Sequence, residues 1–235
     1  MLRKSLIALG LIALAGGAVA DPSVVDAYRD IRRVTPDLTY DLRQQGNGWV
    51  TTSPDWGTAL PITVNGPAGF VEIMDEGTGG GSYRTQIVLW RAGDGTPLVG
   101  IGETAYTPPW PDTTRVRFFG KDGENWSDWT DYVWPDVTLA DFMPDDMRIS
   151  DLRALEAIRA QVFVTLPQKG TRPVAQLITH DSEIAAVCKG ETWFVPSDPA
   201  PYLTYCDRLQ DHLFHTLDLD WIKSEARFEK GGLSR

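Results

Sequence analysis

Residues 83–104, YRTQIVLWRAGDGTPLVGIGET, have the clearest β-strand pattern in the chain. Their first part, Tyr83–Arg91, is rich in β-branched and aromatic residues, which is typical of a strand. Gly93-Asp94-Gly95 has the composition of a tight hairpin turn, and Pro97–Thr104 has that of a returning strand. The stretch therefore predicts an antiparallel β-hairpin.

Similar short runs occur on both sides of this hairpin, at roughly ten-residue spacing in the first half of the chain, which favours antiparallel sheets. In the first half they are Gly69–Met74, Arg115–Phe119 and Trp126–Val133. In the second half they are Val162–Leu166, Val174–Thr179, Ile184–Cys188, Leu217–Trp221 and Ala226–Glu229.

Helical patterns lie before and between these runs. Ser23 is expected to cap an N-terminal helix, Thr138 to open a capping box, and Ser150 to cap a helix with Leu152 and Leu155 on one face. Residues 35–68 are rich in Pro, Gly, Thr and Asp and are expected to be mostly irregular, with a strand at 61–64. Tyr205–Leu213 is expected to form a short helix.

The expected fold is α+β and mainly antiparallel β, with two β-meander modules joined by short helices. The expected segments are a signal peptide at 1–20, a helix and irregular segment at 21–68, a first β module at 69–136, a helical joint at 137–160 and a second, disulfide-containing β module at 161–235. Whether the two modules form one sheet or two domains stays open.

The first twenty residues have the pattern of a cleavable secretory signal. Arg3 and Lys4 precede an apolar run, and the small residues that end at Ala20 match a signal-peptidase site. The run Leu6–Ala20 has 15 residues, whereas a membrane-spanning helix needs about 20. The sequence therefore predicts cleavage after Ala20, a periplasmic or secreted location, and no stable membrane insertion.

Cys188 and Cys206 are the only two cysteines. In an oxidising compartment such a pair predicts a disulfide. A net charge of −10 argues against nucleic acid as a partner, because an acidic protein repels phosphates. No cofactor and no metal site are predicted, since the sequence has no motif for either.

Several turn sequences resemble those of a widespread set of exported bacterial β-rich proteins of unknown function. They are Asp75–Gly81 (DEGTGGG), Asp94-Gly95, Leu166–Thr171 (LPQKGT) and the closing segments Leu219–Lys223 and Arg227–Lys230. The resemblance covers most of residues 69–230. It implies a β-rich fold and no catalytic residue.

Tryptophan is abundant, with nine residues in the chain. Trp110, Trp126, Trp129 and Trp134 are candidate partner-binding aromatics, because Trp rings beside polar residues are surfaces on which sugars or proteins stack. Trp126 and Trp134 share strand parity and are expected on one face. Packing in the core is the alternative for all four.

The three histidines are weak site candidates. His212 and His215 form an H-x-x-H pair, which could bind zinc on a helix but lacks a further motif. His180 precedes Asp181 and Ser182, a set that suggests a hydrolytic triad but is expected to be a polar β-turn.

These features support three hypotheses. The first is a non-enzymatic exported binding or interaction module for a protein or glycan partner. The second is a cell-envelope hydrolase with a His, acid and Ser cleft, and the third is a structural assembly component of unknown oligomeric state.

Overall fold

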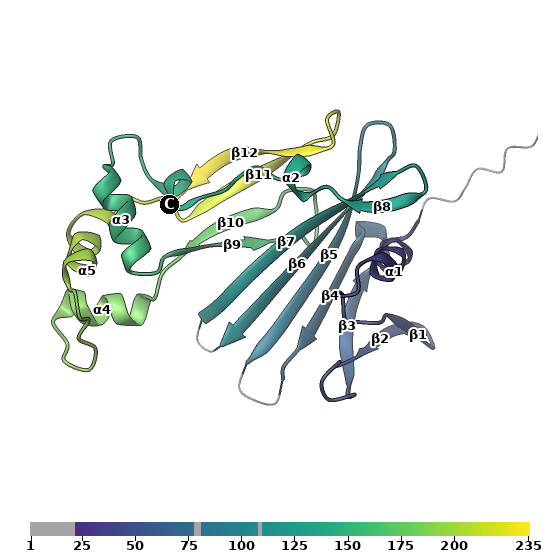
Figure 1. Ribbon diagram of the computed structural model, residues 1–235, viewed down its shortest axis with the longest axis horizontal. Coiled ribbons are helices and arrows are strands. Elements are labelled where there is room, and N and C mark those ends of the chain that lie inside the picture. Colours follow the sequence, from purple (N-terminus) through teal and green to yellow (C-terminus); the bar gives the residue numbers. More distant parts are fainter. Residues whose placement is uncertain (1–21, 78–80, 108–109) are drawn as a thin grey trace, which may run out of the picture.

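The computed structural model describes residues 22–77, 81–107 and 110–235. Within them the chain forms two antiparallel sheets, with helices beside and beyond them (Figure 1). In the first sheet eight strands follow chain order, each paired with the next. They are β1 (Arg43–Gln45), β2 (Gly48–Thr52), β3 (Ala59–Asn65), β4 (Phe70–Asp75), β5 (Ser82–Arg91), β6 (Pro97–Thr107), β7 (Trp110–Asp122) and β8 (Asn125–Asp128).

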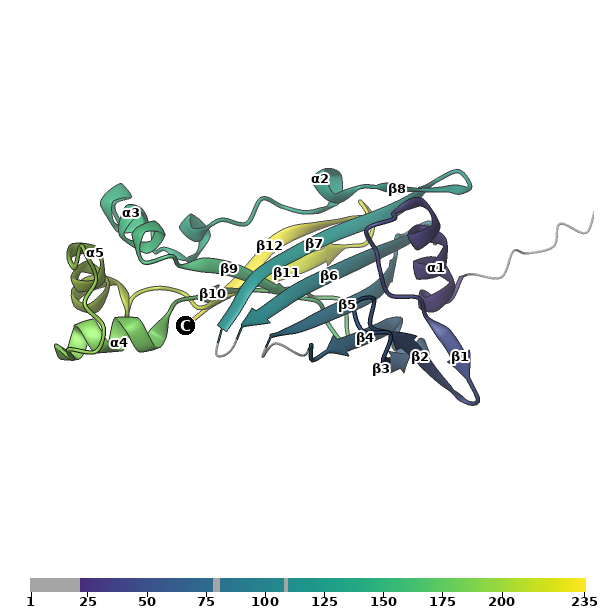
Figure 2. The ribbon, with the colours of Figure 1, turned by 60° about the horizontal axis from the view of Figure 1, so that its bottom comes forward.

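The second sheet has four strands in the order β12-β11-β10-β9. They are β9 (Gln161–Thr165), β10 (Val174–Ile178), β11 (Thr216–Ile222) and β12 (Arg227–Ser234). Figure 2 shows this sheet beside β6 and β7, and residues of both sheets share one hydrophobic cluster. The predicted α+β fold with mainly antiparallel strands is confirmed.

The described residues also form helices and short helical turns. They are α1 (Val24–Val34), the 3-10 turns η1 (Gly66–Ala68) and η2 (Leu139–Phe142), α2 (Thr130–Val133), α3 (Ile149–Ala157), α4 (Asp181–Lys189), α5 (Ala200–Thr204) and the π-helical turn η3 (Tyr205–Leu209). The prediction that Ser23 caps α1 is confirmed, because its side chain accepts a hydrogen bond from the Asp26 N–H. None of the described helices is long and apolar enough to cross a bilayer.

Three sequence predictions for residues 126–188 were wrong in detail. Ile184–Cys188 lies in α4 rather than in a strand, and Gly190 ends that helix with a φ of 68°. The strand expected at Trp126–Val133 ends at Asp128, whose carboxylate accepts hydrogen bonds from Thr130 N and Oγ1 and turns the chain. The third helix begins at Ile149, so Ser150 lies inside its first turn.

The segment expected to be mostly irregular, 35–68, contains β1, β2 and β3. Only the strand expected at 61–64 was predicted, and it corresponds to β3. Gly46, with a φ of 60°, makes the turn between β1 and β2. β3 pairs with β4, so the first sheet extends well before residue 69. This pairing is a tertiary effect that composition does not reveal.

Both faces of the central strands are buried, which explains the continuous apolar run at 87–90. α1 covers one face, where it forms the N-terminal cluster. That cluster includes Val24, Tyr28, Ile31, Leu42, Ile73, Ile87, Val99, Phe119 and Trp126. The other face carries the central cluster, which includes Val88, Trp90, Leu98, Phe118, Phe142, Leu155, Leu219 and Phe228.

Aromatic rings join the two sheets at the centre of the central cluster. The ring of Phe228, from β12, lies 5.3 Å from Trp90 and 5.2 Å from Phe118 of the first sheet. The Trp90 Nε1–H donates to the Thr171 carbonyl at 3.0 Å. A Cβ at Gly100 would lie 2.7 Å from the Trp90 ring, so glycine is required for this packing.

The predicted disulfide is formed between Cys188 and Cys206, whose Cα atoms lie 5.7 Å apart. It joins α4 to η3 across a sequence separation of 18 residues. Figure 1 places α3, α4 and α5 together at the end of the molecule far from α1. The disulfide therefore fastens the helical end rather than either sheet.

Alkaline pH is expected to destabilise the protein through Tyr28. Burial raises the pKa of Tyr28 well above its usual value, and its O–H donates to the Tyr40 carbonyl at 3.0 Å. Burial and the nearby Asp75 carboxylate also raise the pKa of Tyr40. Both tyrosines have a higher pKa in the folded protein than in the unfolded chain, where the pKa of tyrosine is about 10. Their contribution to the free energy of unfolding is therefore present below pH about 10 and is lost as the pH rises above that value.

Urea unfolding at neutral and at alkaline pH tests this expectation. Tyr28→Phe is expected to cost about 1 kcal/mol near neutral pH, through loss of one buried hydrogen bond, and to flatten the loss of stability above pH about 10. An equal alkaline loss in the wild type and in a Tyr28→Phe/Tyr40→Phe variant would contradict the role of these two side chains.

Candidate functional groove

The candidate tryptophans do not share one face. Trp126 lies in the N-terminal cluster with 8% of its surface exposed, and Lys121 packs over its ring. Trp134 packs against the central cluster and stacks on Phe118 at 5.0 Å. The expected shared face of Trp126 and Trp134 is wrong, because α2 separates them after the strand ends. The side chain of Trp110 lies outside the described part of the chain.

Trp129 lies directly between β8 and α2, and two contacts fix its indole. The ring covers Gly120 of β7 so closely that a Cβ there would lie 2.2 Å from the indole carbons. Its Nε1–H donates to Ser127 Oγ at 3.0 Å. The ring is half-buried, and its orientation is set by the strand beneath it.

Tyr132 of α2 forms the second aromatic surface here, and sequence reasoning missed it. Its side chain is 65% exposed. Its ring lies 6.1 Å from that of Trp129 in an edge-to-face arrangement. Its O–H lies 3.4 Å from the Glu225 carbonyl in the turn before β12. The only sequence signal for this aromatic pair was the close spacing of Trp129 and Tyr132. Both residues were assigned to the strand expected at Trp126–Val133, so the pair was not recognised.

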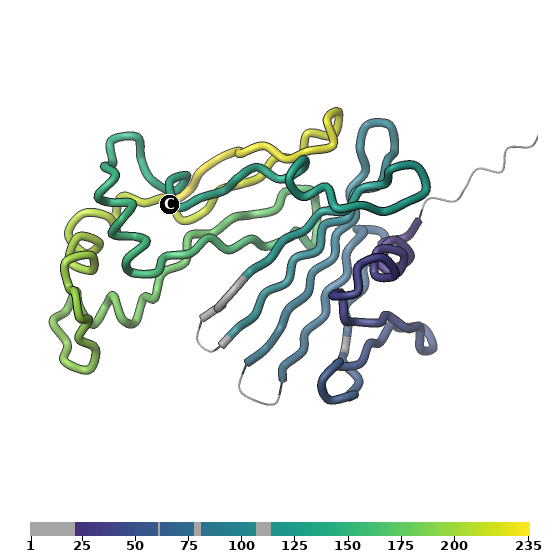
Figure 3. The backbone as a smooth tube through the Cα atoms, viewed as in Figure 1, coloured from purple at the N-terminus to yellow at the C-terminus, as the bar shows by residue number. Residues whose placement is uncertain are grey.

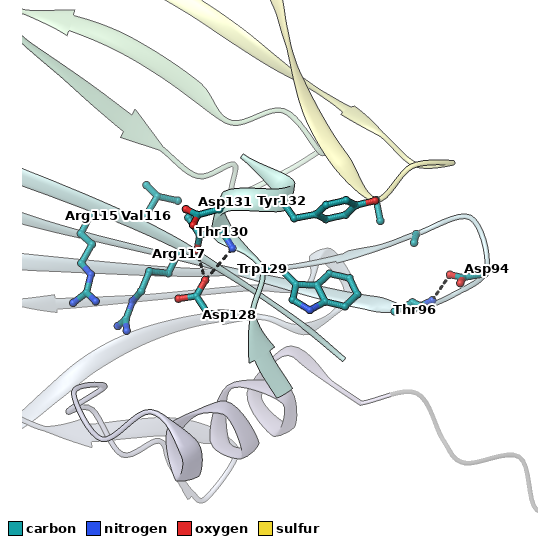
Figure 4. Close-up of a pocket in the computed structure, with 12 residues that line it drawn as sticks. Asp94, Thr96, Arg115, Val116, Arg117, Asp128, Trp129, Thr130, Asp131 and Tyr132 are labelled. Carbon is teal, nitrogen blue, oxygen red and sulfur yellow. Dashed lines mark hydrogen bonds between the residues drawn. The ribbon is translucent and has the colours of Figure 1, made fainter. Parts of the chain in front are cut away.

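A groove of about 880 Å³ runs past these two rings. Arg115, Val116 and Arg117 of β7 line one part of it, and Asp94 and Thr96 line another. Figure 4 shows the Val116 side chain on one side of β7 and the two arginines on the other. The groove therefore extends around the edge of β7, reaching both faces of the sheet.

Fixed charges surround the groove. Asp37 accepts from Arg115 and Arg117, each at 3.0 Å, and Arg117 also donates to Glu103. Partial desolvation opposes ionisation of Asp37, but the two guanidinium groups outweigh it and lower its pKa. The Thr96 N–H donates to Asp94 at 2.9 Å and lowers the pKa of that carboxyl. Both carboxylates are therefore ionised at neutral pH.

The three histidines lie apart from this groove. His215 lines a separate cavity of about 370 Å³ together with Tyr205, Asp181 and Asp211. His180 and His212 are not among the residues that line it, and neither serine nor cysteine lines it. Within the described ranges, no three His, Cys, Asp or Glu side chains are placed to hold a metal ion.

A polar β-turn was expected at His180-Asp181-Ser182, and this prediction was wrong. The segment is the start of α4. His180 is the residue before the helix, and Asp181 and Ser182 are its first two residues. The Thr179 Oγ1–H donates to Asp181 at 2.6 Å. Asp181 therefore sits at the helix N-terminus, where a carboxylate is stabilising.

Comparison with known proteins adds little. No protein-family profile and no curated protein sequence matches the chain. One similar solved structure is described as a domain of an uncharacterized protein from Porphyromonas gingivalis W83. Its TM-score is 0.47 at 16% sequence identity, and the match covers 87% of each chain.

Proposed function

We propose that this chain is an exported, non-enzymatic binding module, and that its partner, a protein or a glycan, lies in the groove beside Trp129 and Tyr132. The signal pattern at residues 1–20 and the Cys188–Cys206 disulfide support an oxidising compartment. The groove residues supply aromatic surface, carboxylates and guanidinium groups, which are groups used for recognition.

The observation that carries the proposal is the fixed placement of an accessible aromatic pair. The Trp129 ring packs on Gly120 and donates a hydrogen bond to Ser127. The Tyr132 ring lies edge-to-face with the Trp129 ring and is mostly exposed. Exposed aromatic rings that are already ordered lose little conformational freedom on binding. Such rings are also the residues that most often dominate binding energy.

Replacing Trp129 by alanine is expected to weaken partner binding about tenfold or more, as truncation of a central aromatic contact does. Trp193→Ala is the matched control, because Trp193 is 61% exposed but lies in the loop before α5. The measurement is binding of both variants and the wild type to an array of glycans and to displayed peptides.

Equal binding by wild type and Trp129→Ala would contradict the proposed site, provided that the circular dichroism of the two proteins agrees. Loss of binding in Trp193→Ala alone would place the partner on the loop that the disulfide closes. Retained binding by Trp193→Ala together with loss in Trp129→Ala is the expected pattern.

The alternative of a cell-envelope hydrolase has one supporting observation, the shared cavity of His215, Asp181 and Asp211. A triad mechanism also needs a nucleophile whose hydrogen bond goes to the base. The residues lining this cavity include no serine or cysteine, and the hydroxyl of Thr179 donates to Asp181. We therefore favour the binding module. A phenotype of the native host that His215→Ala abolishes and Trp129→Ala leaves intact would favour the hydrolase instead.

A further inference from the structure

We propose that the groove takes an extended polypeptide, which adds as a strand to the open edge of β7 at Thr114–Val116. This inference rests on the proposed function, because it names the class of partner for the same groove. It comes from the backbone of β7 rather than from the aromatic pair.

The edge of β7 is only partly covered by its neighbour. β8 pairs with β7 from Phe119 to Asp122 and no further. At the next position, the Phe118 carbonyl accepts from the Trp129 N–H at 2.8 Å, and the Phe118 N–H donates to Thr130 Oγ1 at 2.9 Å. The chain then leaves the sheet into α2, along the path drawn in Figure 3.

Strand geometry fixes where the remaining polar groups point. In an antiparallel strand, alternate residues direct both their N–H and their C=O to the same edge. Phe118 directs both of its groups towards the β8 side, so Val116 and Thr114 do the same. Val116 stands opposite Gly102 and Thr114 opposite Thr104 in the register with β6, with no shift between them and Phe118. Their outer groups therefore lie along the edge of β7 that β8 leaves unpaired, and Val116 also lines the groove.

The far end of this edge is closed to pairing. Pro111 has no N–H to donate, and the register between β6 and β7 shifts at Ala105/Tyr106, opposite the segment around Pro111. Proline and bulges are features by which proteins protect exposed strand edges. The unpaired part is thus short, with the irregularity at one end and Trp129 and Thr130 at the other, and β9 of the second sheet lies close to β7 without pairing with it.

The chemistry of this edge favours a polypeptide over a glycan. Paired N–H and C=O groups recur at every second residue along the edge, and an extended peptide offers the same repeat in complement. The side chains on the two faces differ, since Val116 is apolar whereas Arg115 on the opposite face is 59% exposed. A ligand with alternating apolar and acidic or polar side chains would match both faces.

Proline at position 116 tests the edge itself. Proline is tolerated in an edge strand where the lost N–H faces outward, so Val116→Pro is expected to fold while losing one donor to the ligand. Val116→Thr keeps the donor and is the matched control. The probe is a phage-displayed library of random linear nonapeptides, selected on the wild-type protein.

We expect the selected peptides to bind Val116→Pro at least about tenfold more weakly than Val116→Thr. N-methylation of alternate peptide amides is expected to abolish binding in one register and to leave it unchanged in the other. Binding of the N-methylated peptides is measured on the wild-type protein. It therefore tests strand addition even if Val116→Pro fails to fold.

The two proposals fail in different ways. Peptides or glycans that bind in a Trp129-dependent manner, but equally well to Val116→Pro and Val116→Thr and irrespective of peptide N-methylation, would overturn strand addition and leave the groove as a binding site. Binding that is unaffected by Trp129→Ala, Val116→Pro and N-methylation would overturn both.

Discussion

Replacing Phe228 by alanine is expected to lower the free energy of unfolding by about 3–5 kcal/mol, which is the usual effect of truncating a buried phenylalanine. Phe228 is 2% exposed and contacts four other aromatic rings, Trp90, Phe118, Trp134 and Trp221. It is held in β12, whereas Trp90 and Phe118 belong to the first sheet. Its removal therefore leaves a cavity where the two sheets meet.

Urea unfolding followed by tryptophan fluorescence and by circular dichroism measures this effect. Because the rings join both sheets into one cluster, we expect the two probes to give one coincident transition in the wild type. Phe194→Ala is the control, since Phe194 lies outside both clusters and its ring contacts within the described residues are with Trp193 and Tyr202. Similar losses in the two variants would contradict the central role of Phe228.

Removing the disulfide by Cys188→Ala/Cys206→Ala is expected to cost about 3 kcal/mol, because the freed loop of roughly 18 residues regains conformational entropy in the unfolded state. The bond joins α4 to η3, and the loop between them exposes Trp193 and Val195. Residues 190–199 are therefore expected to become the first site of proteolytic cleavage.

Limited proteolysis with and without a reducing agent checks this second expectation. Reduction of the wild type should reproduce the effect of the double variant, and the variant itself should not respond to the reducing agent. An unchanged unfolding midpoint in the double variant, or first cleavage within the strands of either sheet, would show that the disulfide does not stabilise the helical end.

The sequence predicted those elements whose signals are local. The hairpin at 83–104 was predicted because the strand residues and the Gly93-Asp94-Gly95 turn lie next to each other, and it appears as β5 and β6. Ser23 and Asp26 gave the N-terminal helix in the same way. The strands β1 and β2 were not predicted, because their short polar sequences become strands only through pairing with neighbours.

The candidate site was less predictable, because it depends on how the chain leaves the sheet. Trp129 was among the candidate residues, but its position follows from the turn that Asp128 and Thr130 make and from the missing side chain of Gly120. Tyr132 comes beside it only because residues 130–133 form a helical turn. No sequence motif marks the turn at Asp128, the contact of Trp129 with Gly120 or the helical turn at residues 130–133.

The open edge of β7 was also beyond sequence reasoning. The strand at Arg115–Phe119 was expected, but which part of it has a neighbour depends on β8 ending at Asp128. Pro111 is evident in the sequence, but only the observed strand pairing shows that it lies at the exposed edge of β7 and blocks further pairing there.

The most direct test of the binding groove is an NMR titration that follows the indole N–H resonances of the tryptophans. The ligand is the tightest binder from the peptide and glycan screens. The Trp129 resonance is expected to shift, because that indole lies in the groove and donates to Ser127, while the resonances of Trp56 and Trp193 stay in place. A shift of the Trp56 or Trp193 resonance with an unchanged Trp129 resonance would contradict binding in the groove.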